Sequence, residues 1–311
     1  MRGPLTFSGA DHPPAPAESQ QARTGLIQAA LMDMGTDHDA DHGAIHDRLR
    51  LICIATLRDM GIDPSDTSYL DDLILPLALF IRARARARTG AYLVGIGGGP
   101  GAGKTTMSRL LARCLQEIDR PAATCLSLSI DDFYRAREDR LRMGYKWRTL
   151  PGTHDTDRIA AFLSALDDSG ATIAVPRYDL GRDEPLPDEP LIARPAICLF
   201  DGAMVGSTLP GYEVLARRLD FFIYLDVPTP LLRRWRFDRE RKLRQRSGGK
   251  SGFPLRRMQE FWREALGPSI DKWVRPNAQT ADLVLKFDAV RAVTAAYSPK
   301  TIRIFPDGVE K

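Results

Sequence analysis

Ala91–Leu115, with the sequence AYLVGIGGGPGAGKTTMSRLLARCL, decides the fold of this chain. Its centre, Gly98–Thr105, fits the phosphate-binding loop pattern G-x-x-x-x-G-K-[ST], which is informative when a strand enters the loop and a helix leaves it. The apolar run Tyr92–Ile96 predicts a buried parallel strand before the loop. After the loop, apolar residues recur at the spacing of one helix face, namely at Met107, Leu110, Leu111, Cys114, Leu115 and Ile118.

The composition of this loop suits a triphosphate. Glycines let the backbone adopt positive φ and approach a ligand closely, so that successive N–H groups and the helix dipole point at phosphate oxygens. Lys104 would supply a charge to the β- and γ-phosphates, and the Thr105 hydroxyl a ligand for Mg²⁺. A glycine-rich turn that merely precedes a helix is the alternative, but it does not explain the Lys-Thr pair. We therefore expect ATP to contact Gly98, Gly99, Pro100, Gly101, Ala102, Gly103, Lys104, Thr105 and Thr106.

Length and composition set broad limits. The chain has 311 residues, 43% of them hydrophobic, which is enough for a sizeable core and admits one extended domain or two domains. Its net charge of +4, from 44 basic and 40 acidic residues, does not distinguish small anionic ligands from nucleic acid. No run is long enough for a membrane span, and the start lacks the apolar region of a signal peptide. A reduced, cytoplasmic protein is expected from the scattered cysteines, Cys53, Cys114, Cys125 and Cys198.

The first ninety residues predict a helical prelude. Residues 1–43 have the composition of a disordered tail, and residues 44–90 that of two helices, the second interrupted by Pro76. His38 and His46, with His42 between them, recur at helical spacing among aspartates, which would suit a zinc site. A solvated acidic helix start explains the same residues, and we prefer it because no distant partner ligand is evident.

Two aspartates follow the next apolar run, Ala123–Ile130. A strand parallel to the first one would end at the same edge of the sheet, where ligands bind in open α/β proteins. Asp131 would there reach a hydroxyl to be deprotonated, a metal, or both. The alternative role is a helix N-cap, and the sequence leaves open whether Asp131 or Asp132 is the base.

A third apolar run, Ala196–Phe200, ends at Asp201, a position at which P-loop proteins hold Mg²⁺. Between the second and third runs lies Arg135–Asp155, a polar connection long enough to suggest a functional loop. Asp155 or Thr156 would cap the next helix. From Pro228 the chain is helical and strongly basic. A solvated face or nucleic-acid binding would account for the charge, but we favour a lid whose arginines close on the transferring phosphate.

With these motifs placed, residues from about 69 to 287 resemble the phosphoribulokinase, uridine kinase and pantothenate kinase group of P-loop kinases. Within that group the chain looks most like D-glycerate 3-kinases. The residues that carry the resemblance are Gly98–Thr106, Ser129–Tyr134, Leu150–Asp155, Val175–Asp179 and Trp235-Arg236 with Glu240 and Arg244. Asp201 is shorter than the glutamate usual in the group, and Ala203 stands where we expect tryptophan. The segment after Tyr178 lacks a Gly-Arg-Gly-Asp run.

The resemblance implies a P-loop NTPase fold of class α/β: a three-layer sandwich with a mostly parallel sheet, a helical N-terminal extension and a helical lid. Residues 91–290 would form the kinase domain, 228–252 its lid and 291–311 a C-terminal segment. The implied catalytic residues are Lys104, Asp131, Arg236 and Arg244, and the implied metal ligands are Thr105 and Asp201. The acceptor site would include Asp131, Tyr134, Arg148, His154, Asp155, Arg177 and Tyr178.

The function expected is that of an ATP- and Mg²⁺-dependent kinase acting on a hydroxyl of a small polar metabolite, with glycerate as the leading acceptor. Pantothenate, nucleosides and sugar phosphates are the alternatives within the group. A P-loop ATPase that serves as a switch or scaffold is the alternative of another class. The expected partners are a small-molecule substrate and at most a second copy of the chain, without nucleic acid or membrane.

Overall fold

A six-stranded sheet forms the centre of the computed structural model, which describes residues 43–300 except 65, 66, 68, 119–124, 169, 171 and 188. Five strands are parallel, and the sixth, β10, runs antiparallel at one edge beside β9. In spatial order the strands are β10 (Val293–Tyr297), β9 (Leu283–Phe287), β8 (Phe221–Asp226), β1 (Tyr92–Gly98), β7 (Ile197–Asp201) and β2 (Cys125–Ser129).

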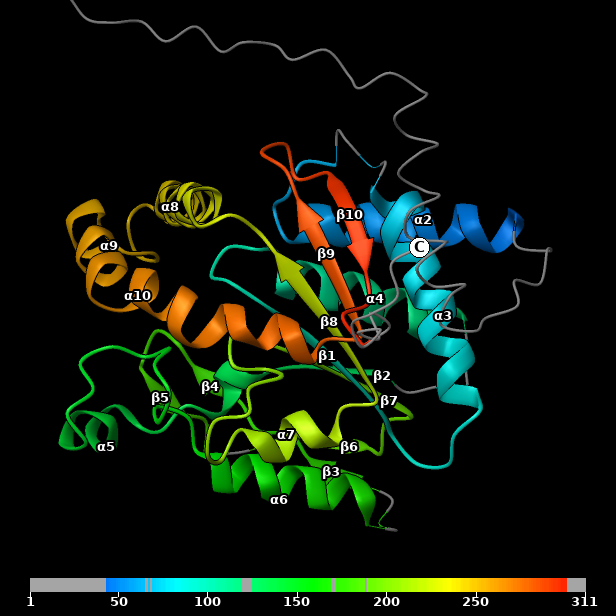
Figure 1. Ribbon diagram of the computed structural model, residues 1–311, viewed down its shortest axis with the longest axis horizontal. Helices are drawn as coiled ribbons and strands as arrows, with labels where there is room; N and C mark the ends of the chain where they lie inside the picture. The colour runs from blue at the N-terminus through cyan, green and yellow to red at the C-terminus, as the bar shows by residue number, and fades with distance from the viewer. Residues whose placement is uncertain are drawn as a thin grey trace, which may run out of the picture.

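Helices cover both faces of the sheet, because its buried strands alternate their side chains between two apolar cores. One face carries α2 (Gly43–Asp59), α3 (Leu75–Arg86) and α4 (Lys104–Ile118), and the other carries α6 (Thr156–Asp167) and α7 (Glu213–Arg218) (Figure 1). The predicted α/β fold class, a three-layer sandwich around a mostly parallel sheet, is confirmed.

A third group of helices lies at the end of the sheet where β8 finishes (Figure 1). It comprises α8 (Thr229–Arg246), α9 (Leu255–Phe261) and α10 (Gly267–Ser269). Two π-helical turns, η3 (Trp262–Leu266) and η4 (Ile270–Val274), and the 3-10 helix η5 (Arg275–Thr280) continue this group back to the sheet. Among the helices that the structure describes, none combines the length and apolarity that a bilayer span requires.

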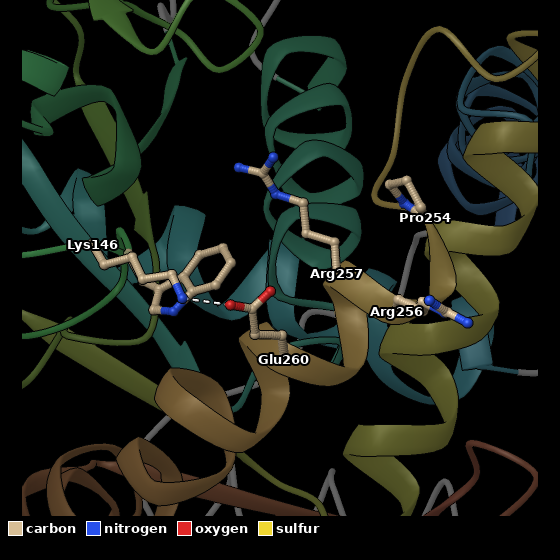
Figure 2. A pocket seen from close by; sticks show the side chains of 6 residues that line it. Lys146, Pro254, Arg256, Arg257 and Glu260 are labelled. Atoms are coloured by element: carbon tan, nitrogen blue, oxygen red, sulfur yellow. Dashed lines mark hydrogen bonds and ion pairs between the residues drawn. The ribbon is translucent and has the colours of Figure 1, made fainter.

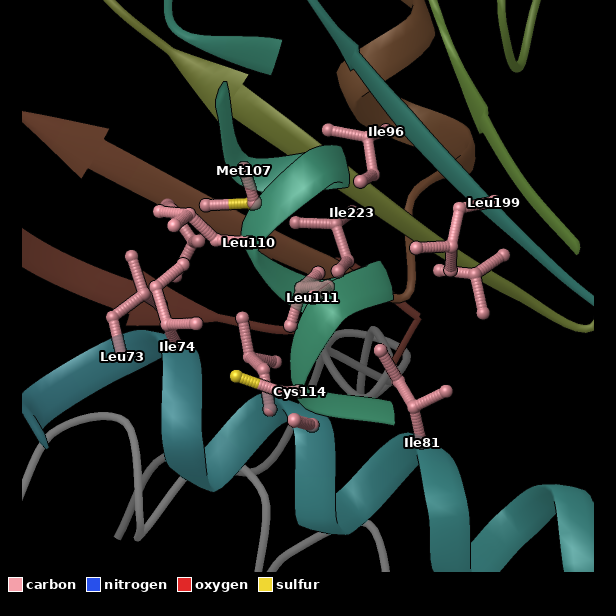
Figure 3. Close-up of a cluster of buried hydrophobic side chains, with 14 of the residues drawn as sticks. Leu73, Ile74, Ile81, Ile96, Met107, Leu110, Leu111, Cys114, Leu199 and Ile223 are labelled. Atoms are coloured by element: carbon pink, nitrogen blue, oxygen red, sulfur yellow. The ribbon is translucent and has the colours of Figure 1, made fainter. Parts of the chain in front are cut away.

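The N-terminal helices share a core with the phosphate-loop helix. Figure 3 shows Leu73, Ile74 and Ile81 packed against side chains of α4 and against Ile223 of the sheet. The contact reaches Cys53 of α2, whose Sγ lies 3.3 Å from the Sγ of Cys114 on α4. All four cysteines are buried free thiols, in agreement with the sequence. The helical extension is therefore part of the main core rather than a separate unit.

Pro76 interrupts the regular α-helical pattern, as its position in the sequence suggested. A π-helical turn, η1 (Leu70–Ile74), continues directly into α3, and the proline follows it in the first turn of α3. Proline has no N–H to donate, and the helical ladder changes from π to α at this point.

The connections hold more structure than the sequence predicted. The loop expected to lack structure, Arg135–Asp155, contains α5 (Arg137–Arg142). The extended segment after it forms two small antiparallel pairs, β3 (Thr172–Ala174) with β6 (Leu191–Ala193) and β4 (Tyr178–Asp179) with β5 (Glu184–Pro185). Short elements of this kind were missed because two- and three-residue strands carry no readable periodicity.

At the two ends of the chain the structure tests only some of the predictions made from the sequence. β10 was not predicted, and it extends the sheet beyond residue 290, the expected end of the kinase domain. Residues 1–42, with the expected disordered tail and with His38 and His42, lie outside the described residues. His46 is described, and its Nε2 lies 3.8 Å from Oδ1 of Asp71 on η1.

Candidate active site

The phosphate loop connects the end of β1 to the start of α4, as predicted. Gly101 and Gly103 adopt φ of +91° and +98°, which side chains rarely tolerate. A Cβ at Gly101 would lie 3.1 Å from the backbone nitrogen of Arg236, and one at Gly99 would collide with Leu232. Helix α8, the predicted lid, therefore packs directly against the loop.

Lys104 links the loop to the carboxylates of the site. Its Nζ donates a hydrogen bond to the carbonyl of Gly99 at 2.8 Å. Burial lowers the pKa of Lys104 to about 8, although the charges of Asp201 and Asp131 act in the opposite direction. Both predicted carboxylates thus lie within electrostatic reach of this ammonium group.

Asp201 ends β7 beside the first turn of α4. It is 3% exposed, and its Oδ1 accepts a hydrogen bond from the Thr105 hydroxyl at 3.1 Å and another from the Ser129 hydroxyl at 3.4 Å. Burial raises the pKa of Asp201 to about 6 in spite of the charge of Lys104. A cation at this position would relieve the cost of burying the carboxylate.

The donor set at Asp201 fits Mg²⁺. A hydroxyl and a carboxylate oxygen are hard ligands, and Mg²⁺ is commonly held by one or two carboxylates together with phosphate oxygens. The described residues contain no group of three or more His, Cys, Asp or Glu side chains placed to hold a metal by themselves. A site completed by nucleotide phosphates does not need such a group, so Thr105 and Asp201 remain the candidate ligands.

Asp131 and Asp132 have different surroundings. They lie in η2 (Ile130–Phe133), where Ser129 is the N-cap and the Asp132 carboxylate accepts from the Ser129 backbone N–H at 3.2 Å. Asp132 also accepts from the Tyr178 backbone N–H and from Arg177 Nη1, each at 3.3 Å. The capping role therefore belongs to Ser129 and Asp132, whereas the side chain of Asp131 is 46% exposed.

The environment of Asp131 keeps it ionised. Desolvation alone would raise its pKa, but the interactions of the carboxylate with His154 and Tyr134 and the charge of Lys104 bring the pKa below its usual value. The Nε2 atom of His154 lies 3.8 Å from Oδ1 of Asp131. His154 is itself held by a 2.8 Å hydrogen bond from Nδ1 to the Tyr212 hydroxyl and by stacking on Tyr134. Tyr212 was not singled out in the sequence.

The predicted acceptor residues lie around Tyr134. Arg148 lies over the rings of Tyr134 and Tyr178, at 6.0 and 5.8 Å from the two ring centres. Asp155 behaves as the sequence alternative proposed: it caps α6 by accepting from the Arg158 N–H at 3.2 Å. Its carboxylate supports the helix that follows His154.

Asp183 organises this side of the site, and sequence reasoning missed it. Its carboxylate accepts from Arg148 Nη1 at 2.9 Å, from the Tyr178 hydroxyl at 2.7 Å and from the buried Arg140 at 2.5 Å. The residue has φ of +64°, a conformation that aspartate tolerates better than most residues. No local motif marks it, because its partners lie five to 43 residues away along the chain.

The lid arginines divide into two groups. Arg236 is mostly buried, binds Glu240 at 2.9 Å and feels the charge of Asp131. Arg239, three residues further along the same helix, lies close enough to affect the pKa of Lys104. Arg244, by contrast, donates to the carbonyls of Gly249 and Gly252 at 3.3 Å and closes the turn after α8. The sequence pointed to Arg236 and Arg244. In the structure the charges of Arg236 and Arg239 influence the pKa of Lys104, and the hydrogen bonds of Arg244 are with the turn after α8.

This chain is a P-loop α/β protein, as the order of its strands, the position of its phosphate loop and the docking of helix α8 on that loop show. Its residues 93–294 match the family model for the phosphoribulokinase / uridine kinase family, so the chain belongs to that family. This family membership confirms the P-loop kinase group predicted from the motifs.

Individual relatives are distant. A pantothenate kinase from Psychromonas ingrahamii is 26% identical over 214 residues, which cover 62% of this chain and 66% of the relative. Uridine-cytidine kinase-like 1 from Mus musculus is 25% identical over 199 residues, covering 63% and 33%. The structure of a D-glycerate 3-kinase from Cryptococcus neoformans superposes with a TM-score of 0.57 at 18% identity, covering 72% and 97%. The chain thus spans about two thirds or less of the two sequence relatives, and the solved structure shows a shared fold.

Proposed function

We propose that this protein is an ATP- and Mg²⁺-dependent kinase that phosphorylates a hydroxyl group of a small anionic metabolite, with glycerate as the leading acceptor. The observation that carries the proposal is the half-exposed carboxylate of Asp131 at the end of β2. It lies within electrostatic reach of Lys104 in the phosphate loop. A carboxylate so placed can accept a hydrogen bond from an acceptor hydroxyl in line with the terminal phosphate of a bound nucleotide.

The chain's own residues divide the reaction between them. Backbone N–H groups of the loop and Lys104 hold the β- and γ-phosphates. Asp131 orients the acceptor hydroxyl and takes its proton as the new P–O bond forms and the bond from the γ-phosphorus to the bridging oxygen of the departing ADP breaks. Mg²⁺ held by Thr105 and Asp201 would neutralise charge on the phosphates. Arg236 and Arg239 of α8 offset the charge that grows on the transferring group and help to exclude water.

Cations on the acceptor side support an anionic substrate. Arg148 is held by Asp183 and lies over the ring of Tyr134, and Arg177 is held by Asp132, the neighbour of Asp131. A nucleoside acceptor would need an aromatic ring free for stacking. The ring of Tyr178 is covered by Arg148 and Tyr134, and its hydroxyl is bound to Asp183.

The acceptor cannot be taken from the relatives. The sequence relatives include pantothenate kinases and a uridine-cytidine kinase-like protein, whereas the D-glycerate 3-kinase shares the fold at 18% identity. Our preference for glycerate rests on the motifs of the sequence and on the arginines near Asp131. With four reduced thiols in the core, we also propose a cytoplasmic location.

The test is a coupled assay of ADP release with purified protein, ATP and Mg²⁺, against D-glycerate, other hydroxy acids, pantothenate, uridine and sugar phosphates. The expected result is acceptor-dependent ADP release that is fastest with a hydroxy acid, with the phosphorylated product identified by mass spectrometry. The Lys104→Ala variant is the matched control for contaminating kinases. ADP release that is independent of every acceptor would contradict the proposal and favour the ATPase switch.

A further inference from the structure

A hollow of about 480 Å³ lies between the loop that carries Trp147 and helix α9 (Figure 2). None of the residues assigned above to ATP, Mg²⁺ or the acceptor lines it. Its volume lies within the range of about 300–1,000 Å³ that is typical of small-molecule sites. The residues that line it are Lys146, Trp147, Pro254, Arg256, Arg257 and Glu260.

Arg257 is held in place without a carboxylate. Its guanidinium lies 5.1 Å from the ring centre of Phe253 and 5.8 Å from that of Trp147, so two aromatic rings fix the cation through their π faces. Neither Arg257 nor its neighbour Arg256 forms an ion pair with any described residue, in contrast to Arg140 and Arg236. The N–H donors of both guanidinium groups are therefore available to a ligand.

The acid in the wall is already paired with a cation. Glu260 accepts a hydrogen bond from Lys146 Nζ at 2.5 Å, drawn as a dashed line in Figure 2, and the same ammonium group binds Glu264 at 2.8 Å. The Arg257 guanidinium thus lies beside Trp147 without an ion-pair partner among the described residues, and Arg256 lines the same hollow. Arginine also binds carboxylate and phosphate through paired hydrogen bonds.

We propose that this hollow is a second anion site, which binds a small polyanion bearing a phosphate group or several carboxylates. Arg257 is its principal contact and Arg256 its second. A ligand there touches both the Lys146–Trp147 segment and α9, which already meet where Trp147 packs on Phe261, 4.8 Å between ring centres. By mass action, ligand binding therefore stabilises the docked position of this loop.

The binding test separates this hollow from the phosphate loop. Isothermal titration of the full chain uses inorganic phosphate and citrate as separate probes, in the Lys104→Ala background so that binding at the loop is weakened. At least one probe is expected to bind at one site per chain. Arg257→Gln or Arg256→Gln in that background should weaken it about tenfold, as for one lost charge-assisted hydrogen bond. If phosphate binds and citrate does not, the ligand belongs to the phosphate-bearing class. If citrate binds and phosphate does not, the ligand is a polycarboxylate.

The matched control is Arg217→Gln on α7, an exposed arginine that does not line the hollow, which should leave the affinity unchanged. Hydrogen exchange should show ligand-dependent protection of residues 145–150 and 255–261 rather than 98–106. The proposal is overturned if neither probe binds, if both hollow variants bind as tightly as their parent, or if Arg217→Gln weakens binding equally. These measurements need no turnover, so their outcome is independent of the proposed kinase activity.

Discussion

The two sides of the candidate site are built in different ways. The donor side, which would hold the phosphate donor ATP, is the phosphate loop with Asp201, and the acceptor side, which would hold the phosphate acceptor, is the region around Asp131, Arg148 and Asp183. On the donor side, a single stretch of chain supplies strand, loop, lysine and helix, and only Asp201 is added from β7. On the acceptor side, Asp131 comes from η2, whereas Arg148 and Asp183 come from two later connections and are joined by a side-chain hydrogen bond. The donor side is thus formed mainly by backbone groups of one segment, whereas the acceptor side is formed by side chains from several segments.

This difference explains how the site can vary within one fold. Positive-φ glycines and a helix N-terminus leave the donor side little freedom, because a Cβ at Gly99 or Gly101 would meet α8. The acceptor network depends on charge pairs whose members can be exchanged without altering the sheet. We therefore expect substitutions on the donor side to abolish turnover, and those in the acceptor network to change the affinity for the acceptor.

The largest effect is expected for Lys104→Ala. Removal of the ammonium group takes away the positive charge that would act on the β- and γ-phosphates of ATP. The value of kcat should therefore fall by about 10³-fold or more, at the upper limit for one electrostatic stabiliser. The melting temperature should not fall, since the lysine is a desolvated cation with one hydrogen bond to the Gly99 carbonyl. Lys286→Ala, on exposed surface of β9, is the control and should keep the parent kcat. Normal turnover in Lys104→Ala would contradict the assignment of the donor side.

A smaller effect distinguishes two arginines of the same helix. Arg239→Gln should lower kcat by about 10²-fold, because we expect this cation, whose charge lowers the pKa of Lys104, to offset charge on the transferring phosphate. Arg244→Gln removes two hydrogen bonds to the turn at Gly249 and Gly252 and should change kcat less than about tenfold, with a small loss in melting temperature. A larger loss of kcat in Arg244→Gln than in Arg239→Gln, measured in steady-state assays, would show that Arg244 is the lid cation.

The smallest effect is expected for Asp183→Asn. The amide keeps the shape of the side chain but loses the charge that holds Arg148, so KM for the acceptor should rise about tenfold while KM for ATP stays unchanged. Asp179→Asn, in the same turn, is the matched control, since its carboxylate contacts only backbone N–H groups of Gly181 and Arg182 among the described residues. Equal KM changes for both substrates would show a general loosening of the loop instead.

The sequence predicted the features that lie within one segment or repeat at a regular spacing. It missed the features that depend on residues brought together by the fold. The phosphate loop and its flanking elements are contiguous, so motif and periodicity identified all three. Eight basic residues between Arg233 and Arg246 look alike in sequence, and only the docking of Leu232 and Trp235 determines which of them face the loop. Asp183 left no signal, because its role depends on Arg140 and Arg148, which the fold brings to it from a separate loop.

The central claim is that Asp131 is the residue that serves the acceptor opposite the phosphate loop. The most direct test compares kcat for Asp131→Asn and Asp132→Asn with the acceptor found in the screen, after both variants are shown to fold by their melting temperatures. We predict that Asp131→Asn loses about 10²–10⁴-fold in kcat, the range for a general base. Asp132→Asn, whose carboxylate caps η2 and holds Arg177, should lose far less. An Asp131→Asn variant that keeps the parent kcat would contradict the account.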